Sequence, residues 1–136
     1  MRAAVTAWIR DAVTGWLAEK RIGKIIAVEA NLSRPAGLQA GLPVWKADRS
    51  TCSLLPMIQL GIHLVDAVEY LIEPVERVSC FAGNIAMPNQ ALDSTASILQ
   101  LKSGVPVALS SYYVSADAFV VRIYGTEGTL HCFPLK

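Results

Sequence analysis

The sequence predicts an α+β fold, in which an open, mainly antiparallel β-sheet carries two helices packed on one face. Apolar residues recur at helical spacing over residues 3–20. Residues 56–72 form a second helical segment that is apolar almost all the way round. After Pro74 the pattern changes to short β-branched segments separated by turn residues. Helix, strand, helix and then a run of strands is an element order typical of α+β domains.

The first helix is amphipathic, and a strand follows it. Gly23 after Lys20-Arg21 is a plausible end of the helix, and residues 24–32 are rich in β-branched side chains. Residues 33–53 form a long connection with two prolines and two glycines, and a structureless loop of this length is often functional. The apolar positions of the helix are Val5, Trp8, Ile9, Ala12, Val13, Trp16 and Leu17.

The helix of residues 56–72 starts at Pro56, which suits a first helical turn. Its polar side chains share one narrow stripe, because they are spaced at i, i+4, i+7 and i+11. A helix buried on most sides with one edge in a polar cleft would show this pattern. Gly61 costs roughly 1 kcal/mol relative to alanine, which indicates a close approach of a backbone, a ligand or a packing neighbour. The stripe consists of Gln59, His63, Asp66 and Tyr70.

The remaining strands are apolar on both sides, and turn signals join them as hairpins. Ser103-Gly104 joins one pair, and residues 125–128 join the last. Two helices cover only one face of such a sheet, so the second face requires a partner. The expected strands are Val75–Ile85, Ser94–Leu101, Val105–Val114, Val120–Tyr124 and Thr129–Phe133.

Composition indicates one domain, residues 1–136, with ample material for a core. Hydrophobic residues make up 53% and charged residues 17%, and the net charge is +1. Without a basic run or a long apolar segment, neither nucleic acid nor a membrane is an expected partner. The N-terminus does not resemble a signal peptide, and Cys52, Cys80 and Cys132 lack paired spacing. We therefore expect a cytoplasmic protein with buried free thiols.

His63 is the strongest candidate for chemistry, because a neutral imidazole can take or give a proton. Gln59, one turn earlier, can orient a hydroxyl or carbonyl group, and Asp66 could hold the imidazole tautomer. The alternative is a core histidine with Asp66 as its structural partner. Trp45 and Lys46 in the long connection either line a cleft or form a solvated surface loop. No further ligand completes a metal site around His63, and no glycine-rich phosphate-binding motif is present.

Several segments resemble one known family in the same order along the chain. P-M-I-Q-L-G-I-H-L-V-D at 56–66 is similar to the central motif of the C-terminal domain in Gfo/Idh/MocA-type oxidoreductases. The further segments are R-I-G-K-I-I-A-V-E-A-N-L-S at 21–33, W-K-A-D at 45–48, E-P-V-E-R-V at 73–78, L-D-S-T-A at 92–96 and Y-G-T-E-G-T-L at 124–130.

The resemblance implies a role for each half of a larger enzyme. A Rossmann domain binds NAD or NADP, and the C-terminal domain supplies substrate contacts and an oligomer interface. His63 then assists proton transfer at the substrate, and Gln59 stands where relatives often have an aspartate. Leu54 and Leu55 replace a glycine-rich turn, and the dinucleotide-binding half is absent from the sequence.

The leading hypothesis is a substrate-binding and oligomerisation domain of an NAD(P)-dependent oxidoreductase. Its substrate is a sugar or polyol, contacted by His63, Gln59, Asp66, Lys46 and Trp45. The chain alone is expected to bind no cofactor and to be inactive, and to form a homo-oligomer through the open sheet face. The alternatives are a non-enzymatic dimerisation or scaffold module, and a small metal-assisted or acid–base enzyme built on His63 and Asp66.

Overall fold

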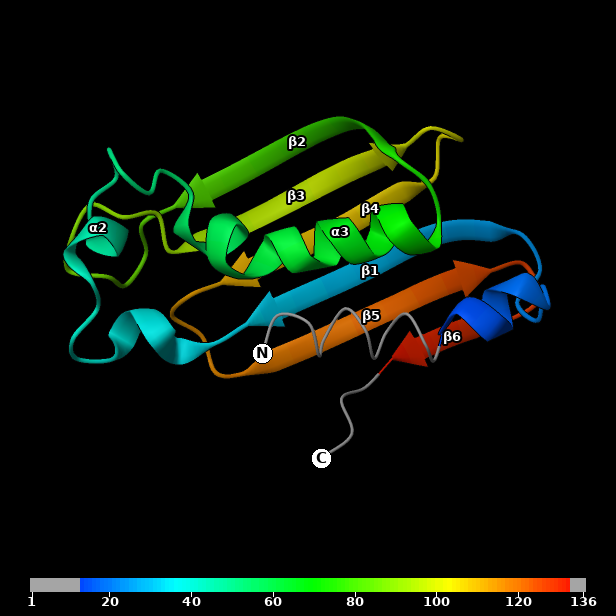
Figure 1. Cartoon of the computed structure of the whole chain (residues 1–136), viewed down its shortest axis with the longest axis horizontal. Helices are drawn as coiled ribbons and strands as arrows, with labels where there is room; N and C mark the ends of the chain where they lie inside the picture. Colours follow the sequence, from blue (N-terminus) through cyan, green and yellow to red (C-terminus); the bar gives the residue numbers. More distant parts are fainter. Residues whose placement is uncertain (1–12, 133–136) are drawn as a thin grey trace.

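A six-stranded sheet with helices on one face forms the structure, a computed structural model that describes residues 13–132 (Figure 1). This architecture confirms the predicted α+β class. The strands are β1 (Ile25–Ser33), β2 (Val75–Gly83), β3 (Ser94–Leu101), β4 (Pro106–Tyr112), β5 (Ala118–Gly125) and β6 (Thr129–Cys132). The helical elements are residues 13–18, η1 (Pro35–Leu38), α2 (Val44–Ala47), η2 (Met57–Gly61) and α3 (Ile62–Leu71).

The strand order is β2-β3-β4-β1-β5-β6, so the first strand lies inside the sheet. All neighbouring strands are antiparallel except β1 and β4, which pair in parallel with Val28 beside Val107. A parallel pair needs a long crossover connection. Here the crossover includes α3, which lies across the middle of the sheet (Figure 1). The topology therefore fixes which face the main helix covers.

The main core lies between α3 and the central strands. Leu64 and Val68 of α3 are buried together with Val28 and Ala30 of β1. The enclosed space between them measures only about 10 Å³, which is about the minimum for one water molecule. Val13 of the first helix is buried in the same core. A ligand therefore has to bind outside this core, on a surface of the domain.

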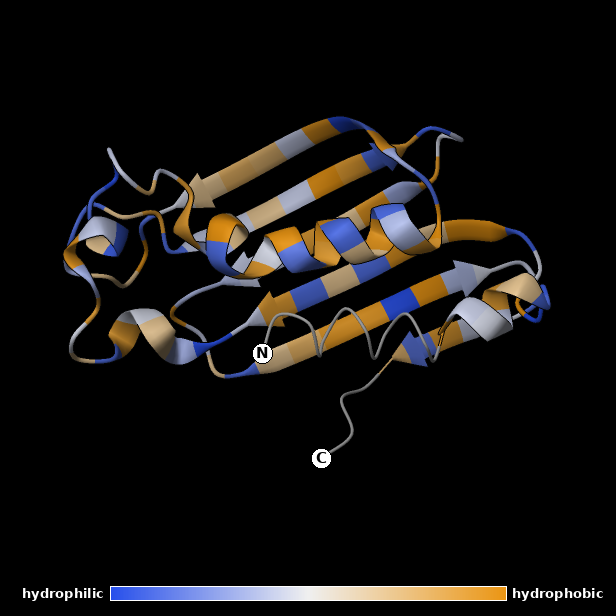
Figure 2. Cartoon of the chain, in the orientation of Figure 1, coloured by the Kyte–Doolittle hydropathy of each residue, from blue (hydrophilic) through white to orange (hydrophobic). Residues whose placement is uncertain are grey.

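Apolar segments occur along α3 and along the strands (Figure 2), and along β3 and β4 it is burial that alternates. In both strands buried and exposed residues follow one another with a period of two. The buried residues face the helices, and the exposed residues form an open face on the other side of the sheet. None of the helices within residues 13–132 is long and apolar enough to cross a membrane.

A second, smaller core lies under the connection between β1 and the main helix. Residues 33–53 were expected to be structureless, and this expectation is wrong, because they contain η1 and α2. The amide of Gly37 donates to the carbonyl of Tyr113 over 2.6 Å, so the connection is fixed to the end of β4. The buried residues of this second core are Cys52, Leu55, Leu60, Met87, Ala91 and Tyr113.

Asp93 holds the loop that closes the second core. Its fully buried carboxylate accepts hydrogen bonds from the amides of Ile85, Ala86 and Met87. Burial by itself would raise the pKa of Asp93, but these hydrogen bonds and one from the Ser94 hydroxyl lower it below its ordinary value. A carboxylate that is stabilised in the folded state fixes the loop at neutral pH.

The three cysteines are free, as expected. Cys52 and Cys132 are buried, but the prediction of burial is wrong for Cys80. Cys80 lies on β2, which is an edge strand of the sheet. Val78, two residues earlier on the same side of this strand, is 66% exposed. The helices do not reach this edge, so its helix-facing side chains stay in contact with solvent. Residues 3–12 of the expected first helix lie outside the described residues, and residues 13–18 are helical.

The turn between β5 and β6 packs against the end of the first helical segment. The amide of Glu127 donates to the carbonyl of Ile22, and the amide of Gly125 donates to the carbonyl of Gly128. A β-carbon added at Gly125 would lie 2.0 Å from the carbonyl oxygen of Ile22. Glycine is therefore required for the close approach of two backbones.

We expect Gly125→Ala to lower the free energy of unfolding by about 3 kcal/mol, because the backbone at Ile22 has to move. The measurement is urea unfolding followed by circular dichroism. Gly15→Ala is the matched control, since nothing lies within 4 Å of its added β-carbon. The control is expected to raise stability by up to ~1 kcal/mol through helix propensity. Equal effects of the two substitutions would contradict the close contact.

Candidate functional site

The polar stripe predicted on the main helix lies on its outer surface. Gln59 belongs to η2, and His63 and Asp66 belong to α3. Gln59 and His63 are partly buried, whereas Asp66 and Tyr70 are exposed. The stripe is thus accessible to a ligand along its whole length, and its first half is the more sheltered part.

The helix turn that carries Gln59 is a π-helix. The amide of Ile62 donates to the carbonyl of Met57, five residues earlier. Single π-turns inside α-helices occur frequently at functional sites. The wider turn also changes the angle between Gln59 and His63 from the value of a regular α-helix. Sequence periodicity predicted the helix but could not show this local distortion.

Gly61 lets the helix pack closely on the sheet. A β-carbon at this position would lie 2.4 Å from the sulfur of Met57 and 3.1 Å from the Ser111 hydroxyl of β4. The Met57 side chain occupies the space that a larger residue would need. Packing rather than a ligand therefore accounts for the glycine inside this helix.

Trp45 and Lys46 lie together on α2. The Lys46 ammonium is 5.3 Å from the centre of the Trp45 ring, within the range of a cation–π contact. The same ammonium lies 3.5 Å from the hydroxyl of Tyr113 at the end of β4. The structure thus connects Lys46 to a buried tyrosine of the second core.

No hydrogen bond joins Gln59, His63 and Asp66 to one another within the described part of the chain. Their joint role in substrate binding stays a prediction, as do those of Trp45 and Lys46. The residues that the structure describes contain no group of three or more histidine, cysteine or acidic side chains able to hold a metal ion.

Leu55 belongs to the second core, because its side chain is fully buried beside Cys52 and Leu60. Leu54 is only partly buried. The leucine pair that replaces a glycine-rich turn thus has two different environments. Leu55 fills the interior below the helix start, and only Leu54 has surface that a ligand can touch.

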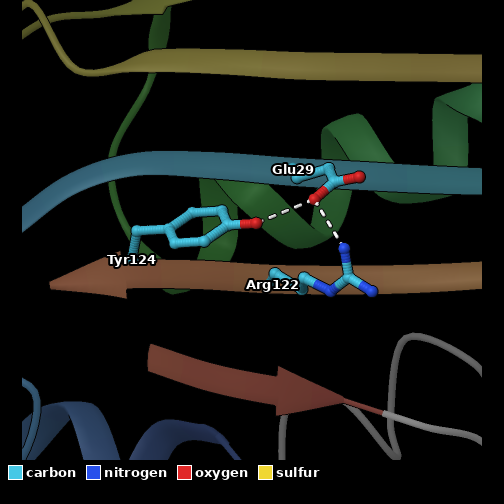
Figure 3. Close-up of polar contacts among 3 residues, drawn as sticks. All are labelled: Glu29, Arg122 and Tyr124. Atoms are coloured by element: carbon cyan, nitrogen blue, oxygen red, sulfur yellow. Dashed lines mark hydrogen bonds and ion pairs between the residues drawn. The ribbon is translucent and has the colours of Figure 1, made fainter. Parts of the chain in front are cut away.

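The open face of the sheet carries a second polar cluster (Figure 3). The carboxylate of Glu29 accepts hydrogen bonds from Arg122 over 3.0 Å and from the Tyr124 hydroxyl over 2.9 Å. The Tyr124 bond, with Arg122, lowers the pKa of Glu29 despite partial burial. Glu29 and Arg122 are direct partners across β1 and β5. This ion pair is partly exposed and contributes at most about 1 kcal/mol.

Beside this cluster the open face forms a shallow hollow of about 340 Å³. Phe81 on the edge strand is 83% exposed and stands at one side of it. Small side chains of the central strands form its floor. The hollow is lined by Glu29, Phe81, Ala96, Ile98, Ala108 and Tyr112, among others.

Sequence analysis missed Tyr113 and the cluster of Glu29, Arg122 and Tyr124. Arg122 and Tyr124 stand two residues apart in an apolar strand, and Glu29 interrupts another. That alternation is a signal for polar residues on one sheet face. Their contact depends on pairing between β1 and β5, which are about 90 residues apart along the chain. No sequence pattern indicates that Lys46 reaches Tyr113.

The sequence matches the model of one known protein family. Residues 11–131 match the model of the GFO/IDH/MocA C-terminal domain. The chain belongs to this family. The resemblance of the central helix motif is thereby confirmed, and the match extends over nearly the whole sequence.

Solved structures with the same fold include other Gfo/Idh/MocA-type oxidoreductases. A protein of Desulfitobacterium hafniense DCB-2, described as an NADPH-dependent oxidoreductase, is 25% identical with a TM-score of 0.83, over 89% of this chain and 35% of that one. WlbA dehydrogenase of Bordetella pertussis, solved with NADH and UDP-GlcNAcA, is 19% identical with a TM-score of 0.71. The aligned region covers 90% of this chain and 38% of WlbA. Scyllo-inositol dehydrogenase of Lactobacillus casei, solved with NAD(H) and scyllo-inositol, is 19% identical with a TM-score of 0.75. The aligned region covers 91% of this chain and 38% of that dehydrogenase.

This chain therefore spans between a third and two fifths of the length of these relatives. No protein with a curated description matches the sequence. The family assignment makes residues 11–131 a GFO/IDH/MocA C-terminal domain.

The different environments of the two leucines predict different effects of truncation. Leu55→Ala is expected to lower the free energy of unfolding by about 2–5 kcal/mol, because it leaves a cavity in the second core. Leu54→Ala is expected to cost under ~1 kcal/mol. Urea unfolding of both variants measures the difference. A similar cost for the two would show that Leu55 is not the core residue.

Proposed function

We propose that the chain is the substrate-binding and oligomerisation domain of an NAD(P)-dependent oxidoreductase that acts on a sugar or polyol. The observation that carries the proposal is the accessible polar stripe on the central helix of a Gfo/Idh/MocA C-terminal domain. His63 takes or gives the proton of a substrate hydroxyl. Gln59, Asp66, Lys46 and Trp45 bind and orient the other polar groups of the substrate.

The residues of this chain do not themselves fit a dinucleotide. A Rossmann-type dinucleotide-binding site needs a glycine-rich turn that leads from a strand into a long helix. Here β1 ends at Ser33 and is followed by Arg34, Pro35 and a short 3₁₀ turn. We therefore assign the nicotinamide to a Rossmann domain, in a longer protein or a separate chain.

The stripe offers the chemistry that removing a proton from a hydroxyl requires. His63 is partly buried and accessible, and an imidazole nitrogen can accept or donate a proton. Neutral hydroxyl groups are bound by amides and other uncharged hydrogen-bonding groups, which Gln59 provides. Scyllo-inositol in one solved relative is a ligand of this neutral, hydroxyl-rich class.

Binding of neutral sugars tests the proposal. We expect D-glucose or myo-inositol at millimolar concentration to shift the amide NMR signals of Gln59 and His63. His63→Ala is expected to weaken this binding about tenfold, which corresponds to the loss of one or two hydrogen bonds. His131→Ala, at the other histidine of the chain, is the matched control and keeps the affinity of the parent chain.

Two results would contradict the proposal. One is the absence of any sugar-dependent shift at the stripe. The other is micromolar binding of NAD or NADP in calorimetry, which would mean that the cofactor site lies in this chain.

The open face of the sheet supports a second function, assembly with another copy of the chain. Phe81 and Ile98 on this face are 83% and 55% exposed. Large exposed apolar side chains around a hollow are typical of protein interaction surfaces. A non-enzymatic scaffold would dimerise through the same sheet face, and the polar stripe of the main helix would then bind no substrate.

We expect the chain to elute as a dimer in sizing chromatography with light scattering at micromolar concentration. Phe81→Glu is expected to shift it to a monomer by placing a charge in the interface. Leu38→Glu is the matched control, because Leu38 is 57% exposed on η1 and lies off the sheet. A monomeric parent chain, or a dimer that survives the change at Phe81, would refute assembly through this face.

A further inference from the structure

Lys46 is a partly buried cation without a carboxylate partner. Its ammonium group lies near the Tyr113 hydroxyl at 3.5 Å and near the face of the Trp45 ring. Salt bridges in the described residues join Arg21 to Glu19 and Arg122 to Glu29, and none includes Lys46. A charge that is partly removed from water is stabilised by an opposite charge. No salt bridge among residues 13–132 supplies that charge to Lys46.

The nearest acidic residue along the chain is already engaged. The carboxylate of Asp48 accepts hydrogen bonds from the amide and the hydroxyl of Ser50, both at 2.8 Å. These bonds hold the pKa of Asp48 below its ordinary value. On the interior side of Lys46 lies Cys52, where burial raises the pKa of the thiol and the ammonium opposes part of that rise. A neutral thiol does not compensate the lysine.

Tyr113 is fixed in place by both of its backbone groups. Its amide donates to the carbonyl of Asp93 over 2.8 Å, and its carbonyl accepts from the amide of Gly37. The side chain is 5% exposed and packs in the second core. The hydroxyl that meets Lys46 is therefore held rigidly, while the lysine stem is the adaptable part.

The hydrogen-bonding groups of this pair are almost all donors. An ammonium has three N–H donors and no acceptor. When one of these N–H groups donates to the oxygen of Tyr113, the Tyr113 O–H and the other two N–H groups still need acceptors. A positive charge with several converging donors matches the two oxygens of a carboxylate.

We propose that Lys46 and Tyr113 form a carboxylate-binding subsite, so that the substrate is a sugar acid rather than a neutral sugar. This inference rests on the proposed function, because it names the substrate class of the same site.

The position of the pair relative to the stripe fits such a ligand. Tyr113 shares the second core with Leu60, the neighbour of Gln59 in η2. Gln59 lies in η2 and His63 follows four residues later in α3, so one sugar ring can contact both side chains. The carboxylate end of the ligand binds at the start of the helix, and a hydroxyl further along the ligand reaches His63.

D-Glucuronate and D-glucose are the probes, because they differ in the carboxylate that replaces one hydroxymethyl group. Both are titrated into the intact chain at pH 7 and followed by amide NMR shifts. We expect glucuronate to bind on the order of tenfold more tightly than glucose, as for one charge-assisted contact. The largest shifts are expected at Lys46 and Tyr113.

Three variants test which side chains cause the preference for glucuronate over glucose. Lys46→Met is expected to abolish the preference for glucuronate over glucose, because it removes the charge and keeps the apolar stem. Tyr113→Phe keeps the buried ring and removes the hydroxyl, and it is expected to reduce the preference several-fold. Lys24→Met is the matched control at an exposed lysine of the same chain, and it is expected to keep the full preference. Thermal melting checks that each variant is folded.

Equal affinity for the two sugars, or a preference that survives Lys46→Met, would overturn the subsite. In both cases glucose would still bind at the stripe, so the proposed function would stand. If neither sugar binds, both the subsite and the proposed function fail. A preference that is lost in Lys46→Met and kept in Lys24→Met supports the subsite.

Discussion

The packing of α3 on the central strand β1 is the contact on which the rest of the structure depends. Leu64 and Val68 meet Val28 and Ala30 with almost no space between them. Because β1 pairs in parallel with β4, the chain has to cross one face of the sheet between them. This crossover buries one face and leaves the other open. It also turns the stripe of Gln59, His63 and Asp66 outward, where a ligand can reach it.

The elements set by local patterns could be predicted from the sequence. Ser94–Leu101 matches its predicted bounds, and the other strands differ from theirs by a few residues at most. The hairpin turn at Gly104, where φ is +92°, is a conformation that glycine favours. Alternation and turn residues act within a few positions, so a single sequence contains them.

Features that depend on tertiary contacts could not be predicted. Burial of Cys80 was expected from the unpaired spacing of the cysteines, but its strand lies at the edge of the sheet beyond the helices. The contact of Lys46 with Tyr113 joins residues 67 positions apart. The π-turn at Gln59 lies where the helix start packs against Ser111 of β4. The sequence thus indicated which residues form the candidate site, but not the partners that orient them.

The two polar clusters of the domain differ in their electrostatic balance, and this difference indicates their uses. On the open face Glu29 and Arg122 neutralise each other, and Tyr124 completes the pair. Covering such a cluster costs less than covering a lone charge, because the attraction between the two charges offsets part of their desolvation. On α2, the partners of Lys46 among the described residues are neutral. A protein that covered Lys46 without an anion would bury an uncompensated charge. The neutral cluster therefore suits assembly, and the charged one suits a small anionic ligand.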